Sequence, residues 1–105
     1  MFARVHTLET TPEQHDAGLA IVRDQLLPWL RDSTGFRGLV RMADREGGKT
    51  LVITLWADED SLRASEEAGE RLTELTTATV GVTKRSLETF EVTLFDVDGR
   101  SGPRH

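Results

Sequence analysis

Hydrophobic residues recur with a period of two in several stretches of the chain, which is the pattern of β-strands with a buried face. The pattern predicts four strands, at residues 2–9, 36–45, 49–57 and within 82–97. Gly47 and Gly48 lie between the second and third stretches, where glycine can take the positive φ angles of a tight hairpin. Residues 51–56 are apolar on both faces of their strand, which predicts cover on both sides of the sheet.

A period of three to four residues in the intervening segments predicts two helices. Thr11 followed by Pro12 is a helix start, because threonine caps the first amides and proline needs no donor there. We expect a kink at Pro28, an end near residues 33–34 and a left-handed cap at Gly35. The predicted buried stripe is Leu19, Val22, Leu26, Trp29 and Leu30.

Asp58 can cap the second helix, and two acidic residues follow it in the first turn, where the helix dipole favours negative charge. The apolar stripe predicted for this helix is thinner than that of the first. It consists of Leu62, Ser65, Ala68, Leu72 and Leu75.

The order βαββαβ predicts an α+β fold of ferredoxin-like topology, with an antiparallel four-stranded sheet and both helices on one face. Residues 1–97 would form a single domain, and residues 98–105 a flexible C-terminal tail. The other face of the sheet would expose a large apolar patch, so we expect a homodimer that pairs through it. A monomer is the alternative if four polar residues cover that face: Thr54, Thr89, Glu91 and Thr93.

Composition limits the classes of partner for this chain of 105 residues. Its net charge of −5 argues against nucleic acid, because phosphate binding needs a cationic face. No stretch approaches the roughly 20 apolar residues that span a bilayer, and the N-terminus lacks a signal-peptide pattern, so we expect a cytoplasmic protein with no membrane partner. There is no cysteine, and His6, His15 and His105 have no recognised metal spacing, so no metal site is predicted.

Four segments together resemble the antibiotic biosynthesis monooxygenase-like family of the dimeric α+β barrel superfamily: Val5–Glu9, Thr34–Gly38, Val52–Asp58 and Leu87–Val92. The resemblance implies a dimeric α+β barrel with a ligand pocket between the helices and the sheet. It also implies a small-molecule enzyme or binder that resembles cofactor-independent monooxygenases and oxidises a hydrophobic, aromatic or polyketide-like substrate with O2. A non-catalytic dimeric module that binds a ligand or serves as a scaffold is the alternative.

Two departures from the family pattern affect this interpretation. His6 stands on the first strand, where the better known enzymes often carry asparagine, and Ser65 stands near a tryptophan position of the second helix. No histidine occurs between Leu62 and Gly81, which argues against haem ligation of the kind seen in haem-degrading relatives.

His6 is the candidate catalytic residue, because a neutral imidazole can accept a proton from an acidic phenol or hydroquinone. A hydrogen-bonded core histidine is the alternative. The candidate substrate-binding residues are Trp29, Trp56, Ser65 and Arg41, although a core role is favoured for both tryptophans. Other side chains weighed for anion binding or proton transfer are Arg4, Arg37 and Glu91, and His15 is expected to be exposed.

Overall fold

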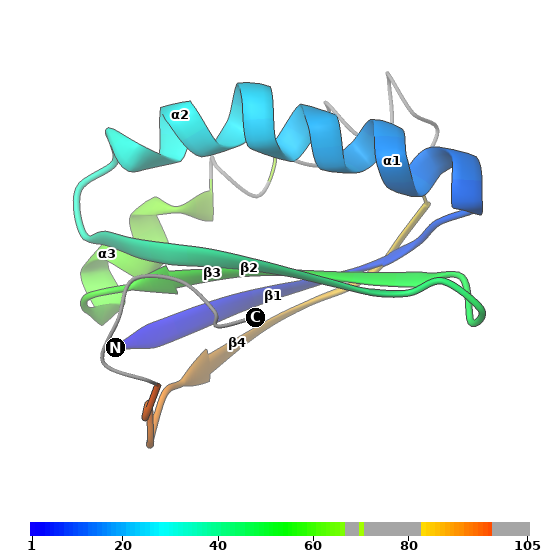
Figure 1. Ribbon diagram of the computed structural model, residues 1–105. Helices are drawn as coiled ribbons and strands as arrows, with labels where there is room; N and C mark the ends of the chain where they lie inside the picture. The colour runs from blue at the N-terminus through cyan, green and yellow to red at the C-terminus, as the bar shows by residue number, and fades with distance from the viewer. Residues whose placement is uncertain (67–69, 71–82, 98–105) are drawn as a thin grey trace.

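The strands form one antiparallel sheet in the order β2-β3-β1-β4, which confirms the predicted ferredoxin-like arrangement (Figure 1). The computed structural model describes residues 1–66, 70 and 83–97. Within them lie β1 (Phe2–Glu9), α1 (Pro12–Ile21), the π-helical segment η1 (Val22–Leu26), α2 (Leu27–Arg31), β2 (Phe36–Asp44), β3 (Lys49–Trp56), α3 (Glu59–Ala64) and β4 (Thr83–Glu91).

The segments α1, η1 and α2 form one continuous helical run above the sheet (Figure 1). Thr11 caps its start in a capping box with Gln14, as a helix-initiating threonine should. Pro28 cannot donate to a carbonyl in the preceding turn, and the run widens into the π-helical segment just before it, where the N–H of Leu27 donates to the carbonyl of Val22. The helix ends at Arg31, slightly earlier than predicted, and Gly35 has the expected positive φ, of 79°.

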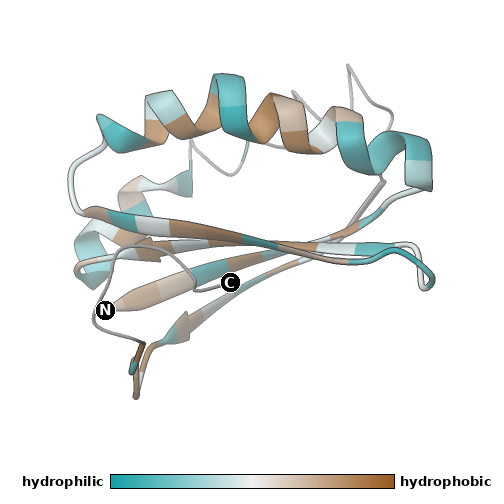
Figure 2. Ribbon diagram, viewed as in Figure 1, coloured by the Kyte–Doolittle hydropathy of each residue, from teal (hydrophilic) through white to brown (hydrophobic). Residues whose placement is uncertain are grey.

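Hydrophobic side chains from the helices and the upper face of the sheet form one core (Figure 2). The buried cluster consists of Leu8, Val22, Leu26, Leu30, Val52, Trp56 and Leu62. The prediction for Leu19 was wrong, because its side chain is 39% exposed. The buried side of α1 instead carries His15, Gly18 and Ile21, so the helix is rotated relative to the stripe read from hydropathy alone.

The opposite face of the sheet carries a second set of apolar side chains. No helix covers this face among the residues that the structure describes (Figure 1). Val40, Met42 and Phe90 are each 43–50% exposed there, beside the half-buried Val5 and Ile53. We refer to these five residues as the open face.

The polar residues that were expected on this open face lie elsewhere. Thr54 and Thr89 flank Arg4 in the two neighbouring strands, and Thr54 is buried, so both belong to the helix-covered side. Glu91 stands opposite Phe2 on that same side, and Thr93 lies beyond the end of β4. The residues named for the monomer alternative are therefore wrong, and the register places Thr7, Ser86 and Glu88 on that side of the sheet instead.

The end of the chain departs in one more respect from expectation. β4 stops at Glu91, so Leu94 lies outside the strand and is 84% exposed. The predicted tail at 98–105 and the later stripe positions Ala68, Leu72 and Leu75 lie outside the described residues. None of the helices described is long and apolar enough to cross a membrane.

Candidate functional site

The helix-covered side of β1 carries two polar side chains in its interior. Strand alternation places Arg4 and His6 on this side together with Phe2 and Leu8. Arg4 is 5% exposed and His6 is 2% exposed. Buried polar groups on a strand need partners or a functional reason, so β1 is the natural starting point for a site.

Arg4 reaches from β1 to the underside of α3, and α3 holds two of its nitrogens. Nε donates to Oγ of Ser65 at 3.0 Å, and Nη2 donates to the carbonyl oxygen of Leu62 at 2.6 Å. The hydroxyl of Ser65 also donates to that carbonyl. Burial lowers the pKa of the Arg4 guanidinium, and the negative charge of Glu66 partly offsets this effect. Arginine titrates so far above neutrality that Arg4 stays charged.

Local sequence fixes α3 at this position over the sheet. Asp58 caps its N-terminus by accepting a hydrogen bond from the amide of Ser61 at 2.7 Å. This bond holds the pKa of the Asp58 carboxyl below its usual range. The turn at Gly35 packs closely on the same residue, since a Cβ added at Gly35 would lie 2.0 Å from Oγ of Ser61. Only glycine permits that approach at a positive φ, so the α2–β2 turn helps to set the position of α3.

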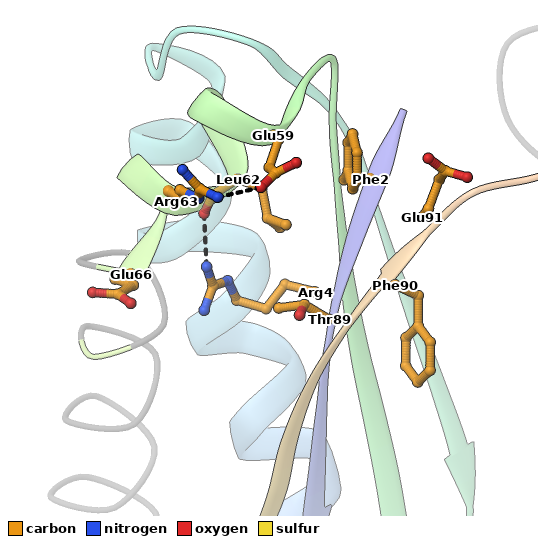
Figure 3. Close-up of a pocket in the computed structure, with 9 residues that line it drawn as sticks. All are labelled: Phe2, Arg4, Glu59, Leu62, Arg63, Glu66, Thr89, Phe90 and Glu91. Atoms are coloured by element: carbon orange, nitrogen blue, oxygen red, sulfur yellow. Dashed lines mark hydrogen bonds and ion pairs between the residues drawn. The ribbon is translucent and has the colours of Figure 1, made fainter.

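A cavity of about 400 Å³ opens beside Arg4, between α3 and the β1–β4 edge of the sheet (Figure 3). We call it the Arg4 cavity. Its inner wall comprises Phe2, Arg4 and Leu62, and Glu59, Arg63, Glu66 and residues 89–91 complete the lining. The ring of Phe90 points away from Arg4, so this residue borders the cavity without filling it (Figure 3). The volume lies within the range of about 300–1,000 Å³ that small-molecule sites occupy.

A second cavity of about 230 Å³ lies against the other side of α3, and we call it the tryptophan cavity. It is lined by Trp29, Ser33, Thr34, Trp56, Ser61, Ala64 and Ser65. Trp56 is 1% exposed, donates to Oγ1 of Thr54 at 3.0 Å and meets the ring of Phe36 edge-on at 5.5 Å. The volume falls below that of most small-molecule sites, and these contacts make Trp56 chiefly a core residue.

The structure brings together three of the five residues that the sequence singled out. Trp29, Trp56 and Ser65 line the tryptophan cavity, and Ser65 also contacts Arg4 from its other side. His6 lines neither of the two cavities and is packed on β1 between Arg4 and Leu8. Arg41 lies away from both, because its Nη2 donates to the carbonyl oxygen of His15 at 3.1 Å, under α1.

His15 is buried, at 8% exposed, which contradicts the prediction that it would face solvent. Among the described residues its Nδ1 has no hydrogen-bond partner. Burial lowers the pKa of its imidazole, and the charges of Arg41 and Arg45 lower it further, against the opposing effect of Asp16. Sequence position alone suggested exposure, and the stripe that runs through Gly18 to Ile21 was the signal that could have corrected it.

Arg4 is the functional candidate that sequence reasoning undervalued. Its place two residues from His6 puts both side chains on one face of β1, which was readable from alternation. The cavity itself could not be predicted from the sequence, because Leu62, Glu66 and Thr89 come together only in the folded chain. Arg37 and Glu91 were also considered for the site; both are exposed, and of the two Glu91 lines the Arg4 cavity.

No family model matches this sequence. Two uncharacterised proteins of Mycobacterium tuberculosis are 34% and 31% identical to it over 67 residues, which is 64% of this chain. The match covers 28% and 30% of those relatives, so the chain corresponds to less than a third of their length.

Solved structures with the same arrangement of elements cover nearly all of the chain. A monooxygenase of Streptomyces coelicolor, solved with nanaomycin D, has a TM-score of 0.69 at 16% identity and covers 95% of this chain and 92% of its own. An antibiotic biosynthesis monooxygenase has a TM-score of 0.62 at 20% identity, over 90% of this chain and 100% of its own. This chain shares the fold of these two proteins.

The resemblance that the sequence indicated is thus confirmed at the level of the fold. The same fold occurs in a protein of unknown function from Nitrosomonas europaea, with a TM-score of 0.67 at 19% identity over 94% of this chain and 95% of its own. Because one fold serves several functions, the activity of this chain has to be argued from its own residues.

Proposed function

We propose that this protein is a small-molecule enzyme or binding protein that takes its ligand into the Arg4 cavity. The single observation that carries the proposal is the cavity of about 400 Å³ beside the buried charge of Arg4, between α3 and the sheet. Concave sites with an apolar wall and a few convergent polar groups are the usual ligand sites of proteins. The fold shared with a monooxygenase that was solved with nanaomycin D supports an aromatic, polyketide-like ligand.

The catalytic form of the proposal is a cofactor-independent monooxygenation of a phenol or hydroquinone. His6 removes the phenolic proton, and the resulting anion donates one electron to O2 to give a substrate radical and superoxide. Recombination of the two and loss of water then give a quinone, so one oxygen atom enters the product and the other leaves as water. Two electrons for that water come from the substrate, and no external reductant is needed.

The burial of His6 gives specific support to the alternative, a ligand-binding protein without turnover. At 2% exposed, and lining neither cavity, its imidazole has no direct path to a ligand in the described part of the chain. General-base catalysis requires that the base lie within hydrogen-bond reach of the proton it removes, directly or through one water. The two forms of the proposal share the binding site and differ only in turnover.

Oxygen uptake with a panel of hydroquinones and naphthols separates the two forms. The catalytic form predicts oxygen uptake that depends on the substrate. The rate should fall at least about 100-fold in the His6→Ala protein, as for loss of a general base. A His6→Gln protein, which keeps a polar group of similar size, controls for loss of packing. Ligand binding with no uptake would establish the binding protein, and uptake that survives both substitutions would remove His6 from the mechanism.

We further propose that the protein is a homodimer that pairs through the open face of the sheet. Val40 and Met42 on one edge strand and Phe90 on the other, with Val5 and Ile53 between them, would otherwise leave apolar surface in water, and monomers rarely expose large apolar patches. A symmetric dimer covers the same patch on both copies. Sedimentation equilibrium should give a dimer mass for the wild type and a monomer mass for the Val40→Glu/Met42→Glu protein.

A further inference from the structure

We infer that the Arg4 cavity selects an organic carboxylate with an apolar body, whose carboxylate oxygens bind the outward edge of the Arg4 guanidinium. The apolar body would lie against Phe2 and Leu62. This inference rests on the proposed function, because it uses the same cavity, and it adds the class of ligand that the cavity takes.

The hydrogen bonds of Arg4 leave one edge of the guanidinium available. An arginine side chain has five N–H donors, and Arg4 directs one from Nε to Ser65 and one from Nη2 to Leu62. Three remain, two on Nη1 and one on Nη2, with no hydrogen bond to the described residues. The donors on the two terminal nitrogens form the planar fork that fits the two oxygens of a carboxylate.

Within the described ranges, the charge of Arg4 also has no close counter-ion. In the described part of the chain no carboxylate lies within ion-pair distance of it, and Glu66 acts on it only at longer range. The exposed Arg23, Arg45 and Arg63 each have an acid partner. A buried cation without a partner is costly, and an anion bound in the adjoining cavity would reduce that cost.

The position of α3 keeps this fork in place. The side-on edge of the guanidinium is held between the Ser65 hydroxyl and the Leu62 carbonyl, so its plane is fixed before any ligand arrives. In Figure 3 one terminal nitrogen of Arg4 bonds Leu62 and the other is directed away from it. A donor fork fixed in advance loses little entropy when it binds.

Three acids around the cavity restrict the ligand to a single negative charge. Glu59, Glu66 and Glu91 line it, against the positive charges of Arg4 and Arg63. Arg63 is already paired with Glu59, which leaves Glu66 and Glu91 on the cavity wall, neither of them in ion-pair contact with Arg4. The carboxylates of Glu66 and Glu91 would repel a dianion such as phosphate. A monocarboxylate carries only one negative charge, and its two charge-assisted hydrogen bonds to Arg4 would outweigh the repulsion.

Isothermal titration calorimetry with naphthoate and its neutral analogue naphthamide tests this inference. The wild type should bind naphthoate about 10- to 100-fold more tightly than naphthamide, which corresponds to hydrogen bonds to a charged group. Arg4→Met should remove that preference and leave naphthamide binding unchanged. Arg45→Gln, which removes the same charge from the surface, should keep the preference, and inorganic phosphate should not compete with naphthoate.

Arg4→Met removes a buried side chain and could disturb the fold. Glu66→Gln tests the same site without that risk, because Glu66 is exposed. It should tighten naphthoate binding several-fold, as the repulsion from Glu66 is removed, without changing naphthamide binding. Equal binding of the two probes, unchanged by Arg4→Met and Glu66→Gln, would overturn the carboxylate site while leaving the cavity as a small-molecule site. Failure of the wild type to bind either probe would overturn both the carboxylate site and the proposed function.

Discussion

Two arginines on the helix-covered face of the sheet make similar hydrogen bonds but differ in the space that is available beside them. Arg4, at the α3 end, donates to the carbonyl of Leu62, and Arg41, at the α1 end, donates to the carbonyl of His15. Burial lowers the pKa of both guanidinium groups. Only Arg4 also lines a cavity of ligand size among those described. A buried or half-buried arginine is therefore not a site by itself, because a ligand also needs space beside the guanidinium.

The difference between the two ends comes from the elements that cover them. The short helix α3 covers the Arg4 end and leaves a cavity on each side of itself. The long helix α1 covers the Arg41 end, where a Cβ added at Gly18 would lie 3.2 Å from Nη2 of Arg41. The α3 end has room for a ligand, whereas at the α1 end the guanidinium of Arg41 occupies the space beneath His15 and Gly18.

The largest effect on the free energy of unfolding is expected for Trp56→Ala. This variant tests whether Trp56 is a core residue at the α3 end or part of a cavity wall. Trp56 is almost fully buried and contacts Phe36 and Thr54, so its truncation should lower the free energy of unfolding by about 3–5 kcal/mol. Urea denaturation followed by circular dichroism measures this. A loss below about 1 kcal/mol would mean that Trp56 belongs to an adaptable pocket wall instead.

An intermediate effect is expected for Gly18→Leu, which tests whether the α1 end is closed. The new side chain would crowd Arg41. We expect the free energy of unfolding to fall by about 1–3 kcal/mol, as for other overpacked sites. Ala64→Leu is the matched control at the other end, because Ala64 is exposed and borders the tryptophan cavity. Its effect should stay within about 0.5 kcal/mol. Equal losses in the two variants would remove the contrast between the two ends.

The smallest effect concerns His15 and the pH dependence of stability. The pKa of His15 is lowered in the folded protein, so the unfolded chain binds its proton at a higher pH than the folded chain does. Stability should therefore be complete above the unfolded value of about 6.5 and should decline as the pH falls below it. His15→Gln should show a shallower decline in thermal unfolding between neutral and mildly acidic pH. Superimposable pH profiles for the two proteins would contradict the burial of this imidazole.

Local pattern and local chemistry were enough to predict most of the fold. Alternation placed the strands, and the caps at Thr11, Asp58 and Gly35 act as their residue types require. Hydropathy misplaced Leu19 because it gives no weight to Gly18, which lies on the buried side of α1 opposite Arg41. The threonines assigned to the open face were misplaced, since register rather than composition decides which face a residue joins.

The candidate site was less predictable than the fold, for a physical reason. His6, Trp29, Trp56 and Ser65 were chosen by residue type and resemblance, and their shared surroundings depend on where α3 packs. Arg4 and Arg41 look alike in sequence, each in a strand with alternating apolar neighbours. A cavity is a property of side chains that meet from distant segments, and one sequence without its fold does not contain that information.

The most direct test of the difference between the two arginines is a titration of the protein with naphthoate, observed through the Nε–Hε signals of arginine in nitrogen-15 NMR spectra. Loss of a signal in Arg4→Met and in Arg41→Met assigns the two residues. We predict that the Arg4 signal shifts and saturates with naphthoate while the Arg41 signal does not move. A shift of Arg41, or an unchanged Arg4 signal at saturating naphthoate, would contradict the account.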